Sequence, residues 1–113
     1  MKREEGKAMT FNSNAVLLDA VVLAVVSKDG TYGYKITQDI RQAIEISEST
    51  LYPVLRRLEK DHCLDTYDME FAGRNRRYYR ITDRGRELLA NYLSVWESYK
   101  TSVDQVLYGG DKK

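Results

Sequence analysis

The positive charge of this chain is concentrated in one short segment. Residues 73–86 hold six arginines and one acidic residue, although the whole 113-residue chain has a net charge of only +1. Guanidinium groups in such a cluster suit anions, above all phosphates. Arg74, Arg76 and Arg77 lie at or beside a predicted turn, where their mutual repulsion costs stability unless an anion is bound. The competing interpretation is an ordinary exposed turn whose charges discourage edge pairing.

A second group of polar side chains lies in the first half of a predicted helix, residues 49–60. Its members are Ser49, Thr50, Tyr52 and Arg56. In helix-turn-helix proteins the N-terminal part of the second helix reaches base edges, and hydroxyls can donate or accept hydrogen bonds there. Arg57 points elsewhere and can reach a phosphate or a surface acid. Alternatively, the hydroxyls only cap the helix and the arginines form an exposed face. The basic hairpin that follows favours nucleic-acid binding.

Metal-dependent and enzymatic functions have little support in the sequence. The chain has one cysteine, Cys63, and one histidine, His62, whereas a zinc site needs three or four ligands. We see no nucleophile–base pair and no glycine-rich phosphate loop. We therefore expect a protein that is not an enzyme and has no cofactor and no metal. The longest apolar run, residues 20–26, is far below the ~20 residues of a membrane span, so we expect no membrane partner. A single cysteine allows no disulfide within the chain, which agrees with the expected cytoplasmic location.

The apolar pattern predicts the elements that position these groups. A first helix over about residues 12–27 is apolar nearly all round, which is typical of a helix buried on several sides. A second helix over residues 33–43 carries Ile36 and Ile40 on one face. After a short turn, Ser47 or Ser49 caps the third helix. Two short helices joined in this way indicate a helix-turn-helix.

A β-hairpin and a long last helix follow. Alternating residues predict strands over 64–71 and 76–81, joined by a turn over 72–75, and Thr82 caps the last helix. The expected fold is mainly α with a small β-hairpin wing: a winged helix-turn-helix plus a long C-terminal dimerisation helix. The expected organisation is an N-terminal arm (1–11), a winged helix-turn-helix DNA-binding domain (12–82), a dimerisation helix (83–108) and a disordered tail (109–113).

The last helix carries apolar and aromatic side chains at alternating spacings of three and four residues. This a/d pattern predicts a helix–helix interface. Little of the chain is left over to cover so long a stripe, so the expected partner is a second copy of the protein. The stripe consists of Leu89, Tyr92, Trp96, Tyr99, Val103 and Val106.

Three motifs resemble the PadR family of bacterial transcriptional regulators: residues 32–36 (YGYKI), 49–60 (STLYPVLRRLEK) and 73–85 (GRNRRYYRITDRG). The resemblance covers about residues 12–108. It implies a winged-helix homodimer in the bacterial cytoplasm that represses promoters by binding operator DNA and is released by small molecules. Asn75 and residues 61–63 depart from the family pattern, which commonly has a basic residue and a glycine turn there. The DNA contacts implied by the resemblance are Tyr34, Lys35, Ser49, Thr50, Tyr52, Arg56, Arg74, Arg76 and Arg77.

The single C-terminal helix resembles that of the multidrug-binding members of the family. In them a tryptophan matching Trp96 pairs with its symmetry mate around flat aromatic ligands, so the resemblance implies a planar aromatic effector. The implied pocket residues are Trp96, Tyr92, Tyr99, Asn14, Ala15 and Leu18. The alternative is that Trp96 only fills the dimer core. The nearby acidic residues, Asp19, Glu97 and Asp104, are expected to be solvated.

Two other functions stay open at this stage. One is a winged-helix module for protein–protein interaction, whose basic hairpin binds an acidic partner. The other is a repressor that responds to no ligand.

Overall fold

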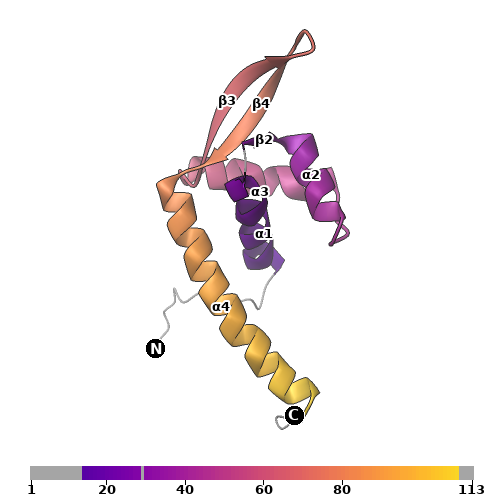
Figure 1. Ribbon diagram of the computed structural model, residues 1–113, viewed down its shortest axis with the longest axis vertical. Coiled ribbons are helices and arrows are strands. Elements are labelled where there is room, and N and C mark those ends of the chain that lie inside the picture. The colour runs from indigo at the N-terminus through magenta and orange to yellow at the C-terminus, as the bar shows by residue number, and fades with distance from the viewer. Residues whose placement is uncertain (1–13, 29, 110–113) are drawn as a thin grey trace.

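The computed structural model describes residues 14–28 and 30–109, with side chains from Val16 onward. The expected N-terminal arm and residues 110–113 of the expected tail lie outside these ranges. The described residues form four helices and a small sheet, arranged as in Figure 1. The elements are α1 (Asn14–Lys28), β2 (Thr31–Tyr32), α2 (Gly33–Arg41), α3 (Glu48–Lys60), β3 (Leu64–Phe71), β4 (Arg74–Ile81) and α4 (Asp83–Leu107). The predicted fold, mainly helical with a hairpin wing and a long C-terminal helix, is confirmed. None of the described helices is long and apolar enough to cross a bilayer.

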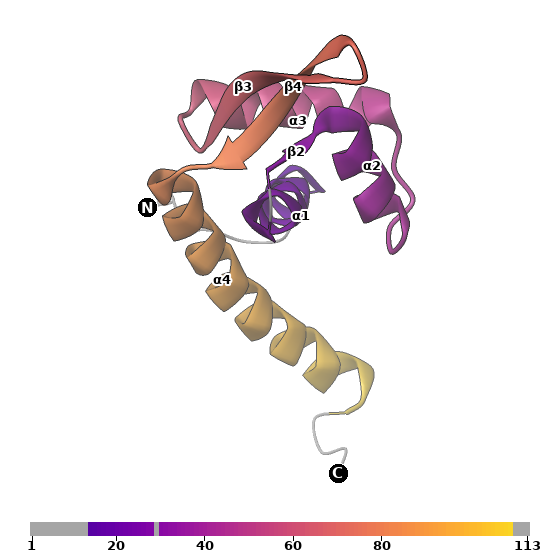
Figure 2. The ribbon, with the colours of Figure 1, turned by 45° about the horizontal axis from the view of Figure 1, so that its top comes forward.

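Helix α1 lies at the centre of the fold. Figure 2 views it nearly end-on, with α2, α3, the sheet and α4 arranged around it. This position explains why apolar residues occupy most of its circumference. The core joins side chains from all of these elements: Val22, Leu23, Val26, Ile36, Ile40, Leu51, Leu55, Leu58, Leu64, Ile81 and Tyr92.

Local signals set both ends of α3. Its N-cap is Ser47, whose hydroxyl accepts a hydrogen bond from the Thr50 N–H at 3.3 Å. At the other end the N–H of Cys63 bonds the Leu58 carbonyl at 2.8 Å, and the N–H of His62 bonds that of Glu59 at 3.0 Å. This pair of bonds is a Schellman motif, and it places His62 at φ 65°, the left-handed conformation that glycine adopts most easily. Residues 61–63 lack the glycine turn expected from the resemblance. They nevertheless form a helix-ending turn, with His62 in the strained left-handed conformation.

The sheet has three antiparallel strands in the order β2-β4-β3. Strand β2, which the sequence analysis did not predict, pairs Thr31 with Tyr79 and Tyr32 with Tyr78. The hairpin turn consists of Ala72 and Gly73, with φ of 56° and 79°, as two-residue hairpin turns require. The predicted four-residue turn is thus shorter by two residues, and the strands pair to the tip of the hairpin.

Helix α4 begins at the Thr82 cap, where the Thr82 hydroxyl accepts from the Gly85 N–H at 3.0 Å. Its first half packs on the core and its second half extends away from the other elements (Figures 1 and 2). The predicted stripe is therefore divided. Leu89 and Tyr92 pack against the core of their own chain, contrary to the expectation that a second copy would cover them. Trp96, Tyr99 and Val106 are exposed by 37%, 42% and 82%.

Candidate nucleic-acid interface

An open groove lies between the wing and the first turns of α2 and α3. Strand β2 pairs with β4 only at Tyr78 and Tyr79, so the edge of β4 beyond them is unpaired in the sheet and faces this groove. The groove contains five of the nine residues predicted to contact DNA, although they come from three separate segments. Its lining is Tyr32, Gly33, Tyr34, Tyr52, Arg74, Asn75, Arg76, Arg77 and Tyr79.

Close packing of α3 on α2 positions Tyr52 at the floor of this groove. A Cβ atom on Gly33 would lie 2.9 Å from Tyr52 Cε1, so the absence of a side chain at Gly33 lets the two helices approach. Burial, with a smaller contribution from Glu48, raises the pKa of the Tyr52 phenol. The phenol therefore keeps its proton and can donate a hydrogen bond.

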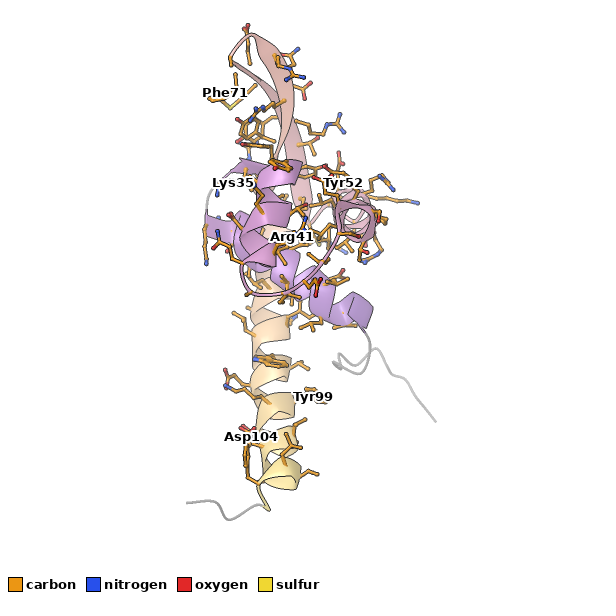
Figure 3. All side chains as sticks on the ribbon, turned by 90° about the vertical axis from the view of Figure 1, so that its right-hand side faces the viewer. Lys35, Arg41, Tyr52, Phe71, Tyr99 and Asp104 are labelled. Atoms are coloured by element: carbon orange, nitrogen blue, oxygen red, sulfur yellow. The ribbon has the colours of Figure 1, made fainter. Side chains whose placement is uncertain are left out.

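The other four predicted residues lie outside this groove. Ser49 and Thr50 are exposed at the start of α3, and their hydroxyls lie 3.0 and 3.1 Å from the capping Ser47 hydroxyl. Lys35 is paired with Asp39 at 2.8 Å, and this hydrogen bond raises the pKa of Lys35. Arg56 is exposed on α3. Figure 3 shows Lys35 and Tyr52 in the body of the protein, below the wing.

The arginines of the wing are not equivalent. The pairing register puts Arg74 opposite Phe71 and Arg76 opposite Met69 on one face of the hairpin, whereas Arg77 is opposite Asp68 on the other. Arg76 is half-buried, while Arg74 and Arg77 are exposed. Arg77 thus lies on the opposite face from Arg74 and Arg76, and it faces an acidic residue across the strand pair. Both features reduce the repulsion expected among the three arginines.

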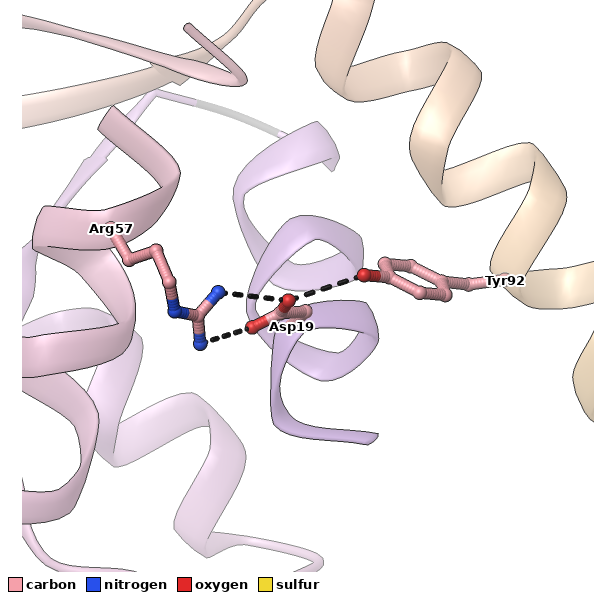
Figure 4. Close-up of polar contacts among 3 residues, drawn as sticks. All are labelled: Asp19, Arg57 and Tyr92. Carbon is pink, nitrogen blue, oxygen red and sulfur yellow. Dashed lines mark hydrogen bonds and ion pairs between the residues drawn. The ribbon is translucent and has the colours of Figure 1, made fainter. Parts of the chain in front are cut away.

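A buried polar cluster joins three helices, and the sequence analysis missed it (Figure 4). Asp19 on α1 accepts hydrogen bonds from Arg57 on α3 at 2.8 and 3.0 Å and from the Tyr92 hydroxyl on α4 at 3.1 Å. Asp19 is only 8% exposed, so the expectation that it is solvated is wrong. Arg57, expected to reach a phosphate or a surface acid, bonds this buried acid while its own side chain stays 43% exposed. A lone charge in an otherwise apolar helix was the available signal, because a buried charge needs a partner.

The same cluster fixes the protonation of Tyr92 and Arg57. Burial, with a further contribution from Asp19, raises the pKa of Tyr92 well above 10.0. The hydrogen bond to Asp19 raises the pKa of Arg57. Tyr92 is therefore a neutral donor and Arg57 a cation at neutral pH.

The residues of the implied ligand pocket are not gathered within one chain. Trp96 and Tyr99 are neighbours on α4, with ring centroids 6.2 Å apart and planes tilted by 45°. Tyr92 is buried in the core beside Asp19, and Leu18 lines a different groove together with the α2–α3 turn. Asn14 and Ala15 belong to α1, but their side chains lie outside the described part of the chain.

Comparison with known proteins gives consistent matches. The family described as "Transcriptional regulator PadR-like family" matches residues 22–91. The chain is 38% identical over 83 residues to the transcriptional regulator Rv3488 of Mycobacterium tuberculosis, covering 73% of this chain and 78% of that protein. The crystal structure of smu.1704 from Streptococcus mutans UA159 superposes with a TM-score of 0.81 at 41% identity, covering 93% of this chain and 99% of that one.

A more distant structure has the same fold. It is Bacillus subtilis PadR in complex with operator DNA, with a TM-score of 0.63 at 23% identity. The match covers 68% of this chain and 46% of the B. subtilis chain.

Proposed function

The chain belongs to the PadR-like family of transcriptional regulators, and we propose that it regulates by binding double-stranded operator DNA with α3 and the wing. The observation that carries this proposal is the groove between wing and helices, which unites Tyr34, Tyr52 and three arginines from separate segments. The resemblance of fold to B. subtilis PadR, a protein solved with operator DNA, is consistent with it.

In this arrangement α3 enters the major groove with its N-terminal end. Ser49, Thr50 and Tyr52 supply hydroxyl groups there, and Arg56 lies about one turn further along. The positive end of the helix dipole adds attraction for phosphate. The arginines of the wing bind the backbone or the minor groove beside it.

The protein acts as a homodimer through the second half of α4. The exposed side chains there form an aromatic and apolar stripe, including Trp96, Tyr99 and Val106, on a helix that extends beyond its own core. Exposed apolar surface of this kind is typical of an interface. Two copies would present two α3 helices to half-sites about 34 Å apart. A monomer by sedimentation at micromolar concentration would contradict this assembly.

A planar aromatic effector binds beside Trp96 in the dimer and favours a geometry in which the two α3 helices no longer fit both half-sites. The exposed, tilted Trp96–Tyr99 pair supports this site. Because Trp96 is the single tryptophan, its fluorescence reports binding directly. Absence of quenching across a broad panel of planar aromatic compounds would leave a repressor that responds to no ligand.

The decisive experiment measures DNA binding by fluorescence anisotropy at several salt concentrations. We expect Arg77→Ala to weaken binding to all sequences and to lower the salt slope by about 1, because one phosphate contact is lost. Arg86→Ala is the matched control, since Arg86 is an exposed arginine of the same basic segment but lies on α4, outside the groove.

Two results would count against the proposal. If the unmodified protein shows no salt-sensitive binding to DNA, the proposal that it binds operator DNA is wrong. Binding of an acidic protein by the wing then becomes the better account. If Arg77→Ala and Arg86→Ala weaken binding equally, the groove is not the contact surface.

A further inference from the structure

Two aromatic rings contact the guanidinium group of Arg76. Its Cζ atom lies 4.5 Å from the ring centroid of Tyr32 and 4.8 Å from that of Phe71. Both distances are within the range of a cation–π interaction, in which the ring face attracts the positive charge. Arg74 and Arg77 have no such contact among the described residues. Among the three arginines near the tip of the wing, Arg76 is thus the one with a defined position.

These contacts join the tip of the wing to the body of the protein. Phe71 is the last residue of β3 before the turn, and Figure 3 shows it near the tip. Tyr32 lies at the other end of the contact, in β2 and at the N-cap of α2. Beyond Tyr78, towards the tip, β4 pairs with β3 but not with β2. The Arg76–Tyr32 contact therefore restrains a part of the wing that β2 does not hold by hydrogen bonds.

Of these two rings, that of Tyr32 belongs to a continuous row on the outer face of the sheet. The ring of Tyr32 meets that of Tyr78 edge-on, with centroids 5.4 Å apart, and the ring of Tyr78 stacks on that of Tyr67, with centroids 5.6 Å apart. Arg80 lies over Tyr67 at 4.9 Å. The side chain that holds Arg76 is therefore itself held by neighbours across three strands.

Ring contacts restrain a guanidinium without using its hydrogen-bond donors. The ring faces attract the charge, while the five N–H groups point outward in the guanidinium plane. The Arg76 side chain makes no hydrogen bond or ion pair within residues 14–28 and 30–109. An arginine held in this way loses little side-chain entropy when it binds an anion, because its rotamer is already restricted.

We propose that Tyr32 and Phe71 are positioning residues of the DNA interface: their rings hold the Arg76 guanidinium beside the groove, where it binds a backbone phosphate. This inference rests on the proposed function and adds two uncharged residues to it. Phe71 is 54% exposed, so a folding role alone gives little reason for an aromatic ring at the tip of a basic hairpin.

The test is a double-mutant cycle on a mixed-sequence duplex of about 30 base pairs, enough for two half-sites one turn apart. We expect Phe71→Leu to weaken binding about two- to fivefold and Phe71→Tyr, which keeps the ring, to bind like the unmodified protein. In an Arg76→Ala background, Phe71→Leu has no further effect. In the matched Arg77→Ala background, its effect is undiminished.

The salt dependence separates positioning from packing. Phe71 carries no charge, so a purely structural role leaves the slope of log K against log salt unchanged. If Phe71 acts through Arg76, Phe71→Leu lowers this slope towards that of Arg76→Ala. In the free protein, the Nε–H proton resonance of Arg76 also moves when the Phe71 ring is removed. Circular dichroism confirms that each variant is folded.

Three results would each overturn the positioning role while leaving DNA binding intact. They are additive effects of Phe71→Leu and Arg76→Ala, equal weakening by Phe71→Leu and Phe71→Tyr, and an unmoved Arg76 resonance. Absence of salt-dependent binding by the unmodified protein would overturn both proposals.

Discussion

Replacing Tyr92 by phenylalanine removes one hydroxyl from the cluster that joins α1, α3 and α4. The hydroxyl donates to Asp19 at 3.1 Å, and Arg57 donates twice to the same carboxylate. A hydrogen bond to a charged group contributes about 1.5–3 kcal/mol. Since Arg57 still neutralises Asp19 and the 6%-exposed ring still fills its site, we expect the lower end, a loss of about 1.5 kcal/mol. At about 2.1 cal/mol/K per residue, this lowers the melting temperature by about 6 °C.

The contribution of Tyr92 to the free energy of unfolding also depends on pH, in a direction that its pKa determines. The pKa of Tyr92 is raised above its ordinary value of 10.0 in the folded protein. Above that pH the unfolded chain releases the phenol proton and the folded chain keeps it, so the unfolded state binds fewer protons and the free energy of unfolding falls as pH rises. Below that pH the stabilisation is complete. The advantage of the unmodified protein over Tyr92→Phe is therefore constant up to about pH 9 and shrinks above about pH 10.

Urea unfolding followed by circular dichroism, at one protein concentration, measures both effects. Tyr78→Phe is the control, because it removes a tyrosine hydroxyl for which no hydrogen bond is found among the described residues. We expect this control to stay within about 0.5 kcal/mol of the unmodified protein. A Tyr92→Phe variant equally unaffected, or a difference that does not shrink at alkaline pH, would refute the reasoning.

Three further substitutions, each followed by the same unfolding assay, test single structural features. Thr82→Ala removes the cap of α4 and should cost about 1 kcal/mol; a cost below about 0.3 would mean that the helix start is held by packing alone. Gly85→Ala should cost at least about 2 kcal/mol, because its Cβ would collide with the Cys63 carbonyl oxygen; a neutral result would show that this contact relaxes freely. His62→Gly should gain about 0.5–1 kcal/mol by removing a side chain from the left-handed conformation, and a loss would show that the histidine side chain stabilises the turn.

Much of the fold could be predicted because its signals are local. Ser47 and Thr82 are capping residues directly before helical runs, and alternation of residue type marks both strands of the wing. Five predicted DNA-contacting residues, among them Tyr52 and Arg77, do line one groove. Element ends were less accurate: α2 stops at Arg41 rather than residue 43, and the hairpin turn is two residues rather than four. Ends depend on individual backbone bonds that residue pattern does not specify.

The sequence by itself determined the helices, the two strands of the wing and the place of the positive charge, because periodicity, caps and composition act over a few residues. Only the tertiary structure decided which distant groups meet. It placed Asp19 between Arg57 and Tyr92, made a strand of Thr31 and Tyr32, and put Arg76 against two rings. It also buried Tyr92 in the core of its own chain, whereas Trp96, on the same predicted stripe, stays exposed. The physical reason is that burial and pairing depend on which surfaces pack together, and residues far apart in the chain carry no local sign of their partners.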